Sequence, residues 1–249
     1  MTMTSLAECP PTGDGTECPA EYALLPPSGG EIHYLWYYIQ GSIMNGDVRR
    51  SLYNSWGFCE RHAWIAIQVE ASFRHCFMMG PAILYEDLLQ LAAPAMAARG
   101  PLKNWLILNR LREKGPCLMC DMNLGPDSKG VARPEMVARG RDTSELHRLA
   151  AMSRSFWEQT VCGRCLGDDA WPRCRPHMLE DLLQGRVRDL DRHLSMIQRL
   201  KRHIVRYSRS FEWAHRGTAT DEDRASLISA VGWFSGWQPF LSMVGMDHR

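Results

Sequence analysis

The stretch Arg186–Arg209, RVRDLDRHLSMIQRLKRHIVRYSR, decides the fold class of this 249-residue chain. Its apolar residues recur three or four positions apart, at Val187, Leu190, Leu194, Ile197, Leu200 and Ile204. This spacing puts them on one face of an α-helix and leaves charged residues on the other face. The sequence therefore predicts a long amphipathic helix here.

The same spacing extends over most of the chain from Glu31 onward. It predicts helices within residues 32–39, 48–53, 64–73, 81–91, 101–111, 144–156 and 221–237. Stretches of alternating β-branched residues, which would indicate strands, are almost absent. The sequence thus predicts an all-α protein with irregular loops, one of them running from Gly115 to about Thr143, and the cysteines gather in such loops.

Composition narrows the class of protein further. Hydrophobic residues make up 45% of the chain, enough for a sizeable core, and the net charge of +1 gives no overall argument for a nucleic-acid or membrane partner. No apolar run reaches the length of a membrane span, and residues 1–15 do not resemble a secretory signal. We therefore expect a bacterial-type cytoplasmic protein, with no membrane partner, whose nine cysteines serve as metal ligands or redox groups.

Four short motifs contain most of these cysteines. Two are Cys-x-x-Cys pairs and two are Cys-x-x-His pairs: Cys117–Cys120, Cys162–Cys165, Cys59–His62 and Cys174–His177. Such spacing lets one turn aim two ligand atoms at the same ion, and zinc takes four sulfur and nitrogen ligands of this kind tetrahedrally. The sequence predicts zinc binding.

The order of these motifs suggests an internal duplication. In each copy a Cys-x-x-Cys pair, called the knuckle here, precedes a Cys-x-x-His pair. In the first copy the knuckle is Cys18-Pro-Ala-Glu21, so the predicted first site is Cys18, Glu21, Cys59 and His62. The expected organisation is an irregular arm at 1–30 that holds a ligand of the first site, a first helical half at 31–114, a second metal-binding half at 115–185 and C-terminal helices at 186–249. We expect these parts to pack as one globular unit.

Several longer motifs resemble an uncharacterised bacterial family with a Cys-Pro-x-Cys knuckle and a Gly-Phe-Cys-x-x-His motif. They are His33-Tyr-Leu-Trp-Tyr37, Gly46-Asp-Val-Arg-Arg50, Ser55–Trp64, Gly80–Leu89 and Phe211-Glu-Trp213, together with Cys117–Cys120 and Cys174–His177. The resemblance implies no function beyond cytoplasmic metal binding. Two departures stand out: Glu21 replaces a knuckle cysteine, and Cys162-Gly-Arg-Cys165 is an addition.

This addition leaves the second site open among three ligand sets. Cys117 and Cys120 can join Cys174 and His177, following the family's pattern, or Cys162 and Cys165 can join them as a compact local finger. Alternatively, the four thiols of the two Cys-x-x-Cys pairs can form a zinc or iron–sulfur site. We favour a zinc site that contains Cys117 and Cys120.

Two alternatives give the chain a chemical activity. If Glu21 is not a ligand, Cys18, Cys59 and His62 form an open three-ligand zinc site, with Glu21 or Glu60 as acid or base beside a metal-bound water. The other alternative is a thiol redox protein that uses Cys162 and Cys165, with Arg164 lowering a cysteine pKa.

The segment from Arg186 to Arg216 concentrates positive charge. It contains nine basic and three acidic residues, a local charge of +6 in a chain whose total is +1. Such a segment is usually the solvated face of a packed helix, but it also permits an acidic protein or a nucleic acid as partner.

Overall fold

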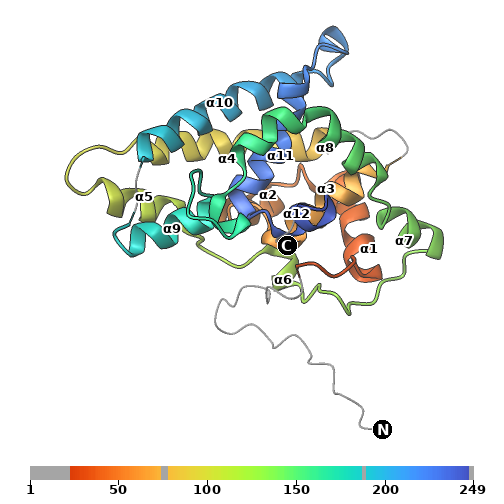
Figure 1. The fold of residues 1–249 in the computed structure, drawn as a ribbon. Helices are drawn as coiled ribbons and strands as arrows, with labels where there is room; N and C mark the ends of the chain where they lie inside the picture. The colour runs from red at the N-terminus through yellow and green to blue at the C-terminus, as the bar shows by residue number, and fades with distance from the viewer. Residues whose placement is uncertain (1–22, 74–77, 187–188, 247–249) are drawn as a thin grey trace.

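The computed structural model describes residues 23–73, 78–186 and 189–246 (Figure 1). This part of the chain contains helices and no strand, which confirms the all-α prediction. The longer helices are α1 (Gly29–Tyr37), α2 (Gly46–Asn54), α3 (Glu60–Ala71), α4 (Met79–Met96), α5 (Lys103–Leu111), α8 (Ser144–Trp157), α9 (Arg175–Leu183), α10 (Leu190–Arg209) and α11 (Asp221–Ser235). The shorter ones are η2 (Tyr38–Ser42), α6 (Leu118–Asp121), α7 (Pro134–Gly140), η3 (Glu158–Thr160), η4 (Gly163–Leu166), η5 (Trp213–His215) and α12 (Gln238–Met243).

The core surrounds two helices that are buried on nearly every face. All residues of α3 from Arg61 to Ala71 are buried, and so are those of α11 from Ala225 to Ser235. A helix that is buried on all sides has to be enclosed by other elements. Accordingly, α11 contacts α8, α10, α4, α9 and α3, which makes it the central element of the fold.

Helix α10 confirms the prediction of a long amphipathic helix. It lies along the outside of the molecule beside α4 and α11 (Figure 1). Its buried residues include Leu194, Ile197, Leu200 and Ile204, four of the six that define the sequence pattern. The opposite face of α10 is exposed and carries its arginines.

Two sequence expectations need correction. The loop expected from Gly115 to Thr143 contains α6 and α7, and α7 has a proline in its first turn, where the missing N–H costs nothing. The last helix, expected to reach Trp237, ends at Ser235 because Gly236 adopts φ 108°, a conformation that L residues rarely take. The chain then restarts as α12.

Within the described ranges, no helix combines the length and the apolar character that a bilayer span requires.

Candidate metal centres

The described residues bring eight of the predicted ligands together as two groups of four. The first centre consists of Cys59, His62, Cys117 and Cys120. The second centre consists of Cys162, Cys165, Cys174 and His177. In each group the candidate ligand atoms all lie within 4.8 Å of one another, and the cysteines concerned are free thiols.

The ligand distances match the edges of a zinc tetrahedron. Bonds of about 2.3 Å to sulfur and 2.0–2.1 Å to nitrogen give edges of about 3.8 Å between sulfurs and 3.5 Å between sulfur and nitrogen. In the first centre Cys59 Sγ and Cys120 Sγ are 3.7 Å apart, and His62 Nδ1 lies 3.2, 3.6 and 3.5 Å from the Sγ atoms of Cys59, Cys117 and Cys120.

The second centre has the same dimensions. His177 Nδ1 lies 3.3 Å from Cys162 Sγ, 3.5 Å from Cys165 Sγ and 3.2 Å from Cys174 Sγ. Cys165 Sγ and Cys174 Sγ are 3.9 Å apart. Both centres therefore present three thiols and one imidazole at distances that suit a single tetrahedral ion.

All four ligand pairs are built by one local device. Cys59, Cys117, Cys162 and Cys174 are each the residue that caps the N-terminus of a short or long helix, namely α3, α6, η4 and α9. The second ligand of each pair follows three positions later, in the first turn. A helix N-terminus carries partial positive charge, so it favours a thiolate over a thiol.

The first centre has a carboxylate behind its imidazole. Glu31 Oε1 lies 3.2 Å from His62 Nε2, and both side chains are fully buried. Arg61 binds the same carboxylate through two nitrogens, at 2.7 and 2.8 Å, and the Ser28 N–H donates to it at 2.7 Å. A hydrogen bond to the second ring nitrogen fixes the tautomer and the orientation of a metal-bound histidine.

The charge state of Glu31 follows from these contacts. Burial alone would raise its pKa, but the hydrogen bonds from His62 and Arg61 lower it to about 2. Glu31 is therefore ionised at neutral pH and stabilises the nearby cations. Cys117 responds in the same way: burial raises the pKa of its thiol, yet hydrogen bonds with Cys120, Cys59 and His62 bring it well below the usual value.

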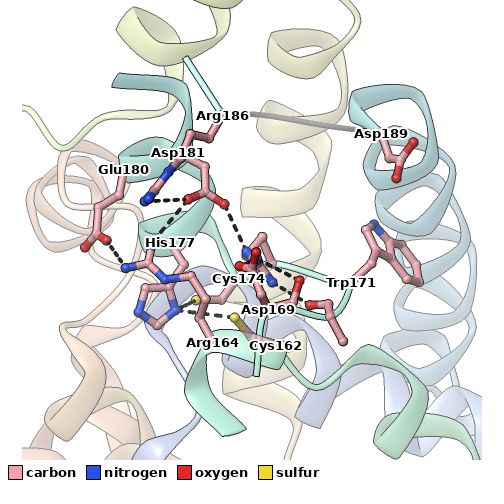
Figure 2. A network of polar contacts seen from close by, with 12 residues as sticks. Cys162, Arg164, Asp169, Trp171, Cys174, His177, Glu180, Asp181, Arg186 and Asp189 are labelled. Carbon is pink, nitrogen blue, oxygen red and sulfur yellow. Dashed lines mark hydrogen bonds and ion pairs between the residues drawn. The ribbon is translucent and has the colours of Figure 1, made fainter. Parts of the chain in front are cut away.

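An ion-pair network supports the second centre (Figure 2). Asp181 of α9 accepts from Arg164 at 3.2 Å, from Arg173 at 2.9 Å and from Arg186 at 3.5 Å. Arg164 also pairs with Glu180 at 2.8 Å. Because Arg164 lies between Cys162 and Cys165, this network fixes the η4 knuckle on the helix that supplies His177.

A close backbone approach explains the glycine of Cys162-Gly-Arg-Cys165. Gly163 donates from its N–H to the Pro172 carbonyl at 3.0 Å. A Cβ at position 163 would lie 2.1 Å from the carbonyl oxygen of Ala170. Only glycine allows the knuckle to fold this closely against the segment that leads to Cys174.

The structure answers the open question about the second site in favour of the compact local finger. Cys162 and Cys165, not Cys117 and Cys120, share a centre with Cys174 and His177. Cys117 and Cys120 do lie in a candidate centre, as favoured from the sequence, but with Cys59 and His62 and not with the Cys174/His177 pair of the family's pattern. The four thiols of the two Cys-x-x-Cys pairs are divided between the two centres.

Three further candidates from the sequence are Cys18, Glu21 and Glu60. Cys18 and Glu21 lie outside the described residues. Glu60 Oε1 accepts the Gln238 N–H at 2.9 Å, so this carboxylate caps the start of α12. Glu31 and Arg61 were missed as site residues; the only sequence signal for Glu31 was its place three residues after Ser28, the capping box that opens α1.

The ligand order differs between the centres. Cys-x-x-His precedes Cys-x-x-Cys in the first centre and follows it in the second. The internal duplication into two related halves therefore stays a prediction. No protein-family model, no curated protein and no solved structure matches this chain, and its function has to be inferred from the two Cys/His centres themselves.

Proposed function

We propose that this chain is a zinc protein, with one ion in each Cys₃His centre, and that the two ions hold irregular loops in place on a helical binding module. The observation that carries the proposal is the convergence of four nitrogen and sulfur ligands at tetrahedral distances, twice. Three thiolates and one imidazole favour zinc over hard cations such as magnesium or calcium.

A structural role agrees better with these centres than a catalytic one. Catalytic zinc usually keeps three protein ligands and one exchangeable position, whereas four-ligand sites rich in cysteine are mainly structural. Both centres supply four ligands, and most of these side chains are buried. A reducing compartment such as the bacterial cytoplasm would keep such thiols available for metal. We also propose membership of the bacterial family whose Gly-Phe-Cys-x-x-His motif matches residues 57–62.

Metal analysis of the purified protein tests the proposal. We expect two zinc ions per chain, one in Cys59→Ser, one in Cys174→Ser and two in the control variant Cys18→Ser. Iron with visible colour would contradict zinc. If Cys18→Ser also loses one zinc ion, as Cys59→Ser does, the result would support instead the open site predicted from the sequence, which contains both thiols.

A redox role for Cys162 and Cys165 gives a different result. A dithiol that cycles to a disulfide would be oxidised by a mild oxidant while the protein keeps its fold and loses no bound metal. If zinc occupies the second centre, oxidation should release one zinc ion per chain, because the same sulfurs bind the ion.

A further inference from the structure

The exposed face of α10 carries a row of arginines. Five of them are exposed: Arg192, Arg199, Arg202, Arg206 and Arg209. At 100° per residue all five fall within a third of the helix circumference, and at 1.5 Å per residue the row is about 25 Å long. We call these five residues the arginine row.

Most of this charge has no carboxylate partner. Among the described residues, only Arg199 of the row forms an ion pair, with Glu222 at 2.6 Å. Arg192 lies instead over the ring of Trp171, with Cζ 3.9 Å from the ring centroid. A row of unneutralised guanidinium groups creates a positive potential along one edge of the molecule and attracts a polyanion.

A groove with a volume of about 530 Å³ lies beside the row. Its lining includes Arg192 and Arg199, the Glu222 carboxylate that pairs with Arg199, and the residues Phe156, Thr160 and Ser229. The space therefore combines aromatic surface, hydrogen-bonding groups and positive charge. It has room for a flat heterocycle such as a nucleobase.

Arg192 and Trp171 both line this groove and together form a platform. Trp171 belongs to the segment between the two ligand pairs of the second centre (Figure 2). This segment is fixed to α10, because the Arg173 N–H donates to His193 Nε2 at 3.1 Å and His193 is buried. A guanidinium stacked on an indole keeps its outer face free to stack on a base.

We propose that this surface binds single-stranded nucleic acid, with the phosphates along the arginine row and one base in the groove against Arg192. Positive grooves that follow the backbone, combined with planar groups on which bases stack, are the usual means of binding single strands. In a duplex the bases stay stacked on one another, so a duplex has no free base to place in the groove. The arginine row is independent of the metal, whereas the position of Trp171 rests on the proposed zinc at the second centre.

Fluorescence anisotropy tests this proposal with a labelled 15-nucleotide single strand of mixed sequence. If about four phosphates are bound, the logarithm of the association constant should fall with that of salt concentration at a slope of about −3. Arg202→Gln/Arg206→Gln should reduce the steepness of this slope by about 1.4. The control Lys129→Gln/Arg133→Gln removes two exposed charges from the segment before α7, outside α10 and the groove, and should leave the slope unchanged.

A second variant tests the platform. Trp171→Ala should weaken binding about 5- to 100-fold, while Trp171→Phe keeps most of the affinity. The zinc content of every sample is measured as well. Weak binding by a protein that lacks zinc at the second centre can then be distinguished from weak binding by a fully loaded protein, and only the latter counts against the nucleic-acid surface. Salt-independent binding, equal affinity for the matching duplex, or equal affinity for polyglutamate would each overturn the proposal, the last two in favour of a general polyanion surface.

Discussion

Glu31 Oε1 and His62 Nε2 lie 3.2 Å apart in a fully buried pair, with the Cys₃His ligand set on the other side of the imidazole. The carboxylate is itself held by Arg61 and by the Ser28 N–H. Helix α1 therefore acts on the first centre without supplying a ligand. This relationship makes Glu31 the residue whose change should affect one centre and leave the other intact.

Glu31→Gln should weaken zinc binding at the first centre about 10- to 100-fold, because it removes the charged partner of the metal-bound histidine. It also leaves Arg61 buried without its counterion, so the free energy of unfolding should fall by about 3–5 kcal/mol. Zinc transfer to a chromogenic chelator gives the affinity, and circular dichroism confirms the fold. Glu135→Gln, on the exposed face of α7, is the matched control. Equal zinc release from both variants would contradict a role for Glu31.

Gly163→Ala should disrupt the second centre alone. The new Cβ would lie 2.1 Å from the Ala170 carbonyl oxygen, so the knuckle has to move away from the segment before Cys174. Overpacking of this kind costs about 1–3 kcal/mol, and we expect at least a tenfold loss of zinc affinity at this centre. Gly125→Ala is the control, because nothing lies within 4 Å of its added Cβ. If Gly163→Ala retains both ions at wild-type affinity, the close approach is not required.

Glu70 should make stability fall as pH rises. Its burial in α3 raises its pKa from the ordinary value of 4.5 to about 8. Between these two values the unfolded chain has released the proton and the folded protein retains it, so the free energy of unfolding decreases with pH in this window. Glu70→Gln should remove this dependence and stabilise the protein by about 4 kcal/mol at pH 8.

Denaturant unfolding at pH 5, 6.5 and 8 measures this effect. The comparison with Glu135→Gln corrects for the general loss of one exposed carboxylate. A Glu70→Gln variant with the same pH dependence as the wild type would show that Glu70 is ionised in the folded protein.

Removal of the metal should unfold the loops before the core. Helices α11 and α3 are buried along almost their whole length, whereas η4 and α6 are a single turn long, and each has one ligand cysteine as its N-cap and another inside it. A metal-binding segment too short to bury its own core depends on the ion for its structure. Hydrogen exchange after chelation should therefore increase first within residues 117–124 and 162–174. Uniform loss of protection along the whole chain would contradict this order.

Local patterns were sufficient to predict the helices and ligand pairs but not how the pairs combine. Helix α10 was predicted because six apolar residues repeat with the helical period over a long stretch. The second centre is local too, since eight residues separate Cys165 from Cys174. In the first centre 57 residues separate Cys59 from Cys117. Only tertiary packing decides which Cys-x-x-Cys pair lies beside Cys59 and His62. Glu31 gave no metal signal because its sequence pattern is that of a helix cap.

The zinc K-edge X-ray absorption spectrum tests the central claim most directly, because it reports the ligand atoms themselves. Two Cys₃His centres predict an average of three sulfur neighbours at about 2.3 Å and one nitrogen neighbour at 2.0–2.1 Å for each zinc ion. This result would support the ligand sets Cys59/His62/Cys117/Cys120 and Cys162/Cys165/Cys174/His177. An average of two sulfurs with two nitrogen or oxygen neighbours would contradict them.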